Sequence, residues 1–331
     1  MGSNVKKNPL IVDINQNSLD DGPGIRSIIF FKGCPLSCVW CQNPEAQNPN
    51  AELLFTHEKC IHCDPCRIHC PTESIVFPLT NVGDSVDLSP NLNRDTCKLH
   101  FNCIRSCPAD VFKKVGEVKE IEELLSIFKD NHVFYENTGG GVMLSGGEPL
   151  MFPEFVKELV NQLTLNEIDY CIETSGYFSF NEDTELILRN ASMIYYDIKL
   201  IDPNLHRNYC GVDNKVIIEN FDKIRDENVA LCPQDQSHIN EVREKSIPIL
   251  IPRTPLIPEI TTATHNLKQL HDFYTNRGIN FIDFLPYNPL WIDKVEKLGM
   301  KCKYNRNTWM TEDELNIVRA MFSRFKFDSF H

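Results

Sequence analysis

Three cysteines near the start of the sequence have a spacing that suits metal chemistry. Cys34, Cys38 and Cys41 follow a short apolar run, with three residues between the first pair and two between the second. Structural zinc normally takes four ligands in two pairs, and no fourth Cys or His stands at a pairing distance here. Three thiolates can instead hold an iron–sulfur cube and leave one iron open to a bound molecule. A zinc site completed from elsewhere in the chain is the alternative.

A second set of cysteines lies within residues 51–115, a stretch rich in Cys, Pro, Asn and Asp that lacks a long helical period. Its first run has the spacing with which bacterial ferredoxins hold two cubane clusters, and comprises Cys60, Cys63, Cys66 and Cys70, followed by Pro71. Its second run has the same spacing, with one His in place of a Cys, and comprises Cys97, His100, Cys103 and Cys107, followed by Pro108. We therefore predict a ferredoxin-like α+β insert at residues 51–115, which divides a larger domain formed by residues 1–50 and 116–331.

The ferredoxin rule, in which the fourth Cys of each run serves the other cluster, predicts two ligand sets. The first set is Cys60, Cys63, Cys66 and Cys107. The second set is Cys70, Cys97 and Cys103, with His100 at the position of the absent Cys. A His ligand to iron would tend to raise the reduction potential. Alternatively, this cluster has three iron atoms, or takes another fourth ligand, or His100 only fills space. We expect one or two iron–sulfur clusters in the insert.

The remaining sequence alternates short apolar runs with amphipathic helical patterns. Strands are predicted at residues 27–31, 142–144, 170–173, 193–199, 247–251 and 280–285. Helices are predicted at residues 121–129, 152–163, 182–189, 216–227, 263–277 and 312–325. About six strand–helix units predict an α/β fold, a partial parallel (β/α)6 barrel with its chemistry at the C-terminal ends of the strands. The polar stretch at residues 233–245 is predicted to be an exposed loop.

Glycines and charged residues stand where the predicted strands end. Gly146 and Gly147 follow one strand, where backbone without side chains lets a ligand approach closely. Glu148 then offers a carboxylate, although a plain turn would use the same residues. Asp197 and Lys199 are two residues apart and therefore point to one face of their strand. Burying two charges is costly unless they pair or meet a ligand, and a surface salt bridge is the alternative.

These motifs occur in an order that resembles one enzyme family. Four further segments accompany the cysteine triplet: Asp-Gly-Pro-Gly-Ile-Arg at residues 21–26, Trp-Cys-Gln-Asn-Pro-Glu at 40–45, Thr-Gly-Gly-Gly-Val at 138–142 and Ser-Gly-Gly-Glu-Pro at 145–149. Over residues 17–298, the sequence resembles the radical S-adenosylmethionine (SAM) superfamily and, within it, the activating enzymes of glycyl radical enzymes. The insert resembles that of the larger members, which activate dehydratases, decarboxylases, lyases and arylsuccinate synthases. The smallest members lack it.

The resemblance implies roles for individual residues. Cys34, Cys38 and Cys41 would hold a [4Fe-4S] cluster with an open iron. The segment of Gly146, Gly147 and Glu148 would bind the amino group of SAM. The other residues implied to bind the cofactor are Trp40, Thr174, Ser175, Asp197, Lys199, Arg253 and Asn288. Arg253 matches a position that contacts the SAM carboxylate, and Asn288 stands where the family often has a His.

Four residues are implied to be catalytic or close to the substrate. Asp197 and Lys199 match positions that contact SAM or the glycyl substrate loop. Asp21 and Arg26 are expected near the incoming peptide, with the organisation of a turn as the alternative. Glu173, beside Thr174, would help to hold a monovalent cation near the SAM carboxylate.

The activity implied by the resemblance begins with one-electron reductive cleavage of SAM to methionine and a 5′-deoxyadenosyl radical. That radical would take a hydrogen atom from a backbone glycine of a partner glycyl radical enzyme. Reduced ferredoxin or flavodoxin is the expected electron donor. One alternative is a radical SAM enzyme that acts on a small molecule or another peptide. The other is a non-enzymatic electron carrier built on the insert.

Charge and hydropathy limit the classes of partner. The chain of 331 residues has 33 Lys and Arg against 46 Asp and Glu, a net charge of −13. This balance argues against nucleic acid or an anionic membrane as the main partner. No apolar run approaches the roughly 20 residues that a membrane helix needs, and residues 1–7 are polar, without the apolar core of a signal peptide. We therefore expect a cytoplasmic protein.

Overall fold

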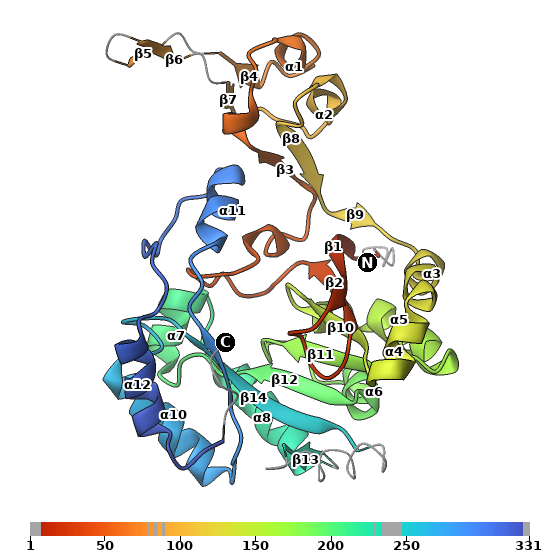
Figure 1. Cartoon of the computed structure of the whole chain (residues 1–331), viewed down its shortest axis with the longest axis vertical. Coiled ribbons are helices and arrows are strands. Elements are labelled where there is room, and N and C mark those ends of the chain that lie inside the picture. Colours follow the sequence, from red (N-terminus) through yellow and green to blue (C-terminus); the bar gives the residue numbers. More distant parts are fainter. Residues whose placement is uncertain are drawn as a thin grey trace, which may run out of the picture.

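Six parallel strands form the centre of a nine-stranded sheet in the described part of the chain (Figure 1). The computed structural model describes residues 8–77, 80–82, 85–87, 90–227, 229–232 and 247–326, so the loop predicted at residues 233–245 lies outside the described residues. The parallel strands are, in spatial order, β2 (Arg26–Lys32), β10 (Gly141–Gly146), β11 (Tyr170–Thr174), β12 (Met193–Asp197), β14 (Ile249–Leu256) and β15 (Asp283–Pro286). The prediction of a parallel α/β fold is confirmed.

Three strands at the sides of this sheet were not predicted. β1 (Leu10–Ser18) pairs antiparallel with β2, β9 (Glu117–Val118) pairs antiparallel with β1, and β13 (Ala230–Leu231) runs parallel to the start of β14. β1 is largely polar and only partly buried, because one of its neighbours is a strand of two residues. The apolar runs that reveal the central strands are therefore absent from the edges.

The inner face of the parallel strands has a layer of apolar side chains, followed towards the carboxyl ends of the strands by a layer of charged ones. Side chains alternate between the two faces of a strand, so residues two or four apart share a face. The apolar layer includes Ile28, Met143, Cys171, Met193, Ile249 and Ile251. Glu173, Asp197 and Arg253 lie nearer the carboxyl ends of the same strands. The register thus brings charged groups to the end of the sheet at which barrels of this kind build their sites.

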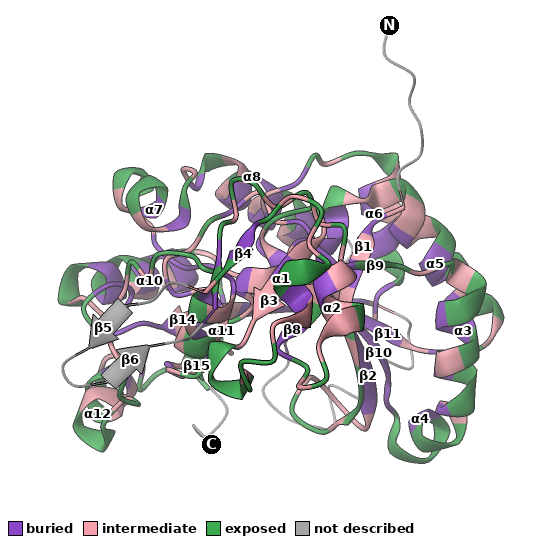
Figure 2. Cartoon of the chain, turned by 90° about the horizontal axis from the view of Figure 1, so that it is seen from above, coloured by how far each residue is buried: buried purple, intermediate pink, exposed green. Residues whose placement is uncertain are grey.

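Helices cover the outer face of the sheet and turn their exposed residues to solvent (Figures 1 and 2). They are α3 (Ile121–Asp130), α4 (His132–Thr138), α5 (Pro153–Leu165), α6 (Glu182–Asn190), α8 (Lys215–Asp226), α10 (Thr264–Asn276) and α12 (Glu312–Met321). Two further short helices, α7 (Pro203–Cys210) and α11 (Trp291–Lys297), pack instead in an apolar group with Leu36 and Trp40. Each predicted helix is found, although α12 ends at Met321 rather than at residue 325. The short helices α4, α7 and α11 were not predicted. None of the described helices has the length and apolar character needed to cross a membrane.

The described residues within 51–115, here called the cysteine-rich lobe, extend from one end of the sheet (Figure 1). They form three antiparallel pairs, namely β3 (Glu52–Phe55) with β8 (Phe112–Val115), β4 (Ile75–Val76) with β7 (Asn91–Leu92) and β5 (Thr80–Val82) with β6 (Ser85–Asp87), and two short helices, α1 (Pro65–Ile68) and α2 (Asn102–Ser106). A separate set of buried residues, which includes Leu53, Ile75 and Phe112, fills the lobe. The buried Lys32 of β2 ties the lobe to the sheet through Glu52, at 2.6 Å.

Candidate active site

The three cysteines of the triplet lie in a loop, residues 33–41, that follows β2. We call it the cluster loop. Its start is held by backbone bonds from Gly33 N to the Ala46 carbonyl (2.7 Å) and from Cys34 N to the Gln47 carbonyl (3.0 Å). Its middle is held against the end of α7, because Ser37 N donates to the Cys210 carbonyl (2.8 Å) and Val39 N to that of Tyr209 (3.0 Å).

The cysteine thiols of this loop have the donor chemistry of an iron–sulfur cluster. Burial raises the pKa of Cys34 well above its usual range and that of Cys41 to about 11. A hydrogen bond from the Cys210 thiol, aided by the nearby Lys199 ammonium, lowers the pKa of Cys38 in spite of burial. In the residues that the structure describes, no three His, Cys, Asp or Glu side chains form a site for a single metal ion. Three thiols on one loop fit a cubane, whose irons take thiolates as ligands.

The carboxylate of Glu148 is buried and accepts hydrogen bonds from several groups of the protein. Oε1 accepts from Leu150 N (3.1 Å), and Oε2 accepts from Ser175 N (2.8 Å) and Ser175 Oγ (2.6 Å). Thr174 Oγ1 lies within 3.0 Å of both oxygens. Burial raises the pKa of Glu148, although these donors oppose the rise. The contacts make Glu148 a brace between the ends of β10 and β11, and direct binding of SAM by its side chain stays a prediction.

The glycine pair before Glu148 allows a close approach to β2 and the cluster loop. Gly146 has φ +110°, and a Cβ there would stand 2.4 Å from Phe31 N. A Cβ on Gly147 would stand 2.0 Å from the Gly33 carbonyl oxygen. Gly147 N donates to the Phe31 carbonyl, and Glu148 N donates to the Gly33 carbonyl, both at 2.8 Å. The two glycines are therefore required to seat this turn against the start of the cluster loop.

Four charged residues, Glu173, Asp197, Lys199 and Arg253, form what we call the charged layer. Arg253 reaches Glu173 through Nη1 (2.5 Å) and Asp197 through Nε (2.9 Å), and Lys199 Nζ lies 2.7 Å from the other oxygen of Asp197. Burial opposes the ionisation of Asp197, but Lys199 and Arg253 outweigh it and lower its pKa. Asp197 in turn raises the pKa of Lys199. Asp197 and Lys199 are mostly buried, so their ion pair differs from the surface salt bridge considered as the alternative.

The structure does not bring together the side chains of Glu173 and Thr174, which were predicted to hold a monovalent cation. They are consecutive on β11 and point to opposite faces of the strand. Glu173 is engaged by Arg253 and by the Ser145 hydroxyl. Thr174 turns to Glu148. The sequence pattern missed both Ser145 and the bridging position of Arg253 between two carboxylates.

Asp21 and Arg26 lie in different environments. The Asp21 carboxylate accepts from Ser18 Oγ (2.5 Å), and burial raises its pKa while Glu173 and Arg253 act on it electrostatically. The fully buried Arg26 is at the amino end of β2 and contacts the Pro23 carbonyl (3.0 Å) and Asp169 (2.7 Å). This end of the sheet is opposite to the cluster loop, so Arg26 has the contacts of a residue that organises the turn, as the alternative proposed.

Trp40 and Asn288 border the segment that follows Cys41. Trp40 is buried in an apolar group with Leu200 and Trp291. The Asn288 carbonyl accepts from Gln42 Nε2 (3.0 Å), while its side-chain oxygen accepts from Leu290 N (2.9 Å). The backbone of Asn288 therefore supports Gln42, the residue that follows the cluster loop.

His206 of α7 is buried and helps to hold the end of this helix. Its Nδ1 lies 2.6 Å from the Val212 carbonyl oxygen, so this nitrogen carries the hydrogen. Burial lowers the pKa of His206 to about 4, against the opposing effect of this bond. The free imidazole of an unfolded chain has a pKa of about 6.5.

The folded protein should therefore lose stability as the pH falls from about 6.5 to 4, because only the unfolded chain takes up a proton at His206 in this range. The loss from this residue amounts to roughly 3 kcal/mol. In His206→Asn, which keeps a donor for the Val212 carbonyl, the dependence on pH should be weaker by about that amount. Urea unfolding of the apo protein at several pH values measures it, and an unchanged dependence in the variant would contradict the assignment.

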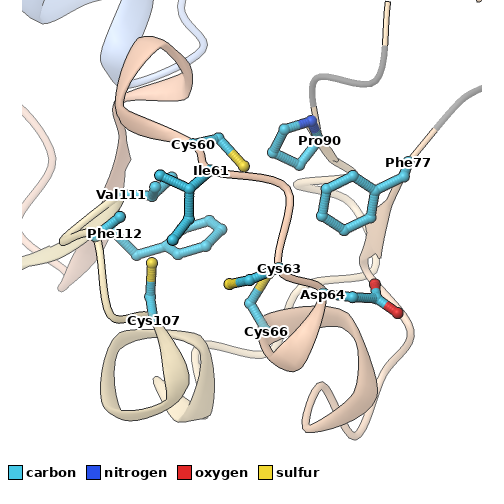
Figure 3. Close-up of a pocket in the computed structure, with 11 residues that line it drawn as sticks. Cys60, Ile61, Cys63, Asp64, Cys66, Phe77, Pro90, Cys107, Val111 and Phe112 are labelled. Carbon is cyan, nitrogen blue, oxygen red and sulfur yellow. The ribbon is translucent and has the colours of Figure 1, made fainter.

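Two pockets of the cysteine-rich lobe gather the side chains of the two predicted ligand sets. One is lined by Cys60, Cys63, Cys66 and Cys107, and Figure 3 shows these four side chains around one space, beside Ile61 and Phe112. The other is lined by Cys70, Cys97, His100 and Cys103. Burial raises the pKa of Cys66 and of Cys103 to about 11. Metal binding at either pocket would therefore release protons.

Comparisons with known proteins agree with this chemistry. The model of the Radical SAM superfamily matches residues 28–232, which is more than half of the chain. The trans-4-hydroxy-L-proline dehydratase activating enzyme of Clostridioides difficile is 30% identical over 97% of this chain and 98% of that protein. The indoleacetate decarboxylase activating enzyme of Tractidigestivibacter scatoligenes is 31% identical over 89% of this chain and 88% of that protein.

A third relative has a lyase as its named target. The isethionate sulfite-lyase activating enzyme of Oleidesulfovibrio alaskensis is 31% identical over 87% of this chain and 86% of that protein. The chain therefore belongs to the radical SAM superfamily and, within it, to the activating enzymes of glycyl radical enzymes.

Proposed function

We propose that the partner is a glycyl radical enzyme of the dehydratase, decarboxylase, lyase or arylsuccinate-synthase type. The main support for this proposal is the position of the cluster loop beside the charged layer, together with relatives that are named for such targets. When bound, the cluster and SAM would supply, with one electron from a reduced donor, methionine and a 5′-deoxyadenosyl radical able to take a hydrogen atom from the glycine. The residues of the chain hold SAM, orient it and exclude water from the reaction.

The charged layer is proposed to bind the methionine end of SAM by exchanging partners. All four of its members are already paired within the protein. A carboxylate from SAM therefore has to draw Arg253 or Lys199 away from Asp197 or Glu173, and the carboxylate released can face the SAM amino group. The exchange keeps the net charge of the buried layer constant, which limits its cost. A monovalent cation at Glu173 would likewise have to displace Arg253.

The backbone of Gly146 and Gly147 is proposed to face the amino group of SAM, with Trp40 and Asn288 beside the cluster loop. Thr174 and Ser175 act through Glu148, whose carboxylate they hold. Asp21 is proposed to meet the incoming glycine loop, because its buried carboxyl lies within electrostatic reach of Glu173 and Arg253. Arg26 is proposed to shape the turn that carries Asp21.

We also propose that the cysteine-rich lobe is a ferredoxin-like domain, residues 51–115, inserted between residues 1–50 and 116–331. Its two pockets, each with four Cys or His side chains, would each hold an iron–sulfur cluster. Such clusters could pass electrons from reduced ferredoxin or flavodoxin to the cluster loop. So many free thiols require a reducing compartment such as the cytoplasm, and we therefore place the protein there.

His100 is proposed as the fourth ligand of the second pocket. His100→Ala should then lower the iron content of the whole protein by one to four atoms, since a cubane loses either one corner or all of its iron. His100→Cys should restore the iron and lower the reduction potential of that cluster. The control is His69→Ala, an exposed His whose Nδ1 bonds to the Pro65 carbonyl. Iron content and electron paramagnetic resonance (EPR) spectra identical in His100→Ala and the parent would remove His100 from the ligand set.

The function is tested by mixing the anaerobically reconstituted, reduced protein and SAM with glycyl radical enzymes encoded near its gene. The expected result is a glycyl radical EPR signal in the partner and one 5′-deoxyadenosine per radical. Deoxyadenosine without a glycyl radical on any candidate would favour a small-molecule or other peptide substrate. Reduced clusters that yield no deoxyadenosine would favour an electron carrier.

A further inference from the structure

Cys210 is a fourth cysteine at the cluster loop, and the proposed function gives it no part. It is the last residue of α7 and is completely buried in the apolar group that Cys34 and Cys38 contact. Its thiol lies beside that of Cys38, and both side chains belong to the same apolar group. It does not lie at a metal-ligand spacing from any other cysteine in the sequence, so only the fold brings it to this loop.

Backbone hydrogen bonds on both sides of Cys38 fix its position relative to Cys210. The residues before and after Cys38 donate their backbone N–H groups to the carbonyls of Cys210 and Tyr209. Gly211, with φ +88°, ends the helix, and a Cβ there would stand 2.3 Å from Ser37 Oγ. The start of α7 is equally defined, because Asp202 caps it through Asn204 N (2.8 Å) and Leu205 N (2.9 Å). The helix therefore holds the Cys210 sulfur at Cys38 with little freedom.

The chemistry of the two sulfurs determines which is the donor. A cysteine that binds iron does so as a thiolate, which can only accept hydrogen bonds. Cys210 must then keep its hydrogen and donate it. A hydrogen bond to a cluster sulfur stabilises the reduced state, which carries one more negative charge, and so raises the reduction potential.

We propose that Cys210 is a positioning residue whose S–H group donates to the Cys38 thiolate and raises the reduction potential of the cluster held by the cluster loop. This inference rests on the proposed function, because it requires that cluster. The reaction begins with electron transfer to this cluster, so a higher potential allows a weaker donor to reduce it. The same bond would restrict the orientation of the Cys38 side chain.

The test compares Cys210→Ala, which removes the donor, with Cys210→Ser, which keeps an O–H donor. Cys171→Ala is the matched control, since Cys171 is also fully buried but lies in the apolar layer of the sheet. The full-length proteins are reconstituted anaerobically and titrated with dithionite and redox mediators, with the reduced cluster read by EPR. The spectrum of a variant with Cys34, Cys38 and Cys41 all changed to Ala is subtracted to remove the clusters of the lobe.

At a fixed solution potential, Cys210→Ala should have a ratio of reduced to oxidised cluster several-fold lower than the parent, a tenfold fall corresponding to 59 mV for one electron. Cys210→Ser should recover most of the ratio, and Cys171→Ala should match the parent. Equal ratios in Cys210→Ala and the parent at equal iron content would overturn the proposal. So would equal shifts in the Ala and Ser variants, since these would indicate packing alone.

A further outcome separates Cys210 as a donor from Cys210 as a fourth ligand. If it is a donor, SAM changes the EPR spectrum of the parent, because one iron is open. A spectrum that responds to SAM only in Cys210→Ala would assign Cys210 to the iron and overturn the proposal. If no signal remains in the parent after this subtraction, the cluster loop holds no reducible cluster, and the proposed function fails instead.

Discussion

Asp197→Ala is expected to destabilise the apo protein by about 3–5 kcal/mol, the cost of removing one partner from a buried ion pair. Asp197 is the shared partner of both cations in the charged layer, Lys199 and Arg253. Without it, Lys199 loses the carboxylate that it contacts, and Arg253 keeps only Glu173 within the charged layer. The side chains are 9% exposed for Lys199 and 11% for Arg253, so water compensates little of the lost charge.

The same substitution should lower the rate of 5′-deoxyadenosine formation by roughly 100-fold, because a displacement of about 1 Å in a positioning group can have that effect. Lys199 and Arg253 would lose the partner that sets their positions. Urea unfolding of the apo protein measures the stability, and chromatography of deoxyadenosine after anaerobic reduction with SAM measures the rate.

Glu123→Ala is the matched control, because Glu123 pairs with Lys119 on the surface of α3. Loss of an exposed pair should cost less than about 1 kcal/mol and leave the rate unchanged. If Asp197→Ala kept both the stability and the rate of the parent, Asp197 would have no part in the site.

The central strands could be predicted because burial on both faces leaves a continuous apolar run, as in β10 and β14. The antiparallel β1 gives no such run, since many of its side chains are exposed. α7 has eight residues and a low apolar content, so its periodicity is weak, although its Asp202–Pro203 start is a recognisable cap. The sequence is informative where burial is uniform and uninformative at edges and short helices.

The site shows the same division between local and long-range information. The cysteine spacings and the same-face placement of Asp197 and Lys199 follow from short segments. The contact of Cys210 with Cys38 joins residues far apart in the chain, and the bridge from Arg253 to Glu173 depends on the register of β11, β12 and β14. The glycines and Glu148 could be recognised from their motif, but the donors that surround the carboxylate could not.

A second large effect is expected at Glu148. Glu148→Gln preserves the shape of the side chain but replaces one acceptor oxygen by an NH2 donor. Either orientation of the amide leaves a backbone N–H, that of Leu150 or that of Ser175, facing another donor. The hydroxyls of Thr174 and Ser175 can rotate to adapt, whereas a backbone N–H cannot. The expected loss is about 2–4 kcal/mol of stability, from a broken hydrogen bond to a charged group and an unsatisfied buried donor.

Ser175→Ala is the matched control, because it removes one hydroxyl donor and leaves the backbone N–H groups of Leu150 and Ser175 with an acceptor. Its cost should be about 1 kcal/mol. Urea unfolding of the apo proteins and SAM affinity by equilibrium dialysis measure the two effects separately. A brace predicts that Glu148→Gln weakens both, because the turn of Gly146 and Gly147 loses its anchor to β11. If Glu148 instead contacts SAM directly, Glu148→Gln would weaken SAM binding while the stability of the apo protein stayed at the parent value.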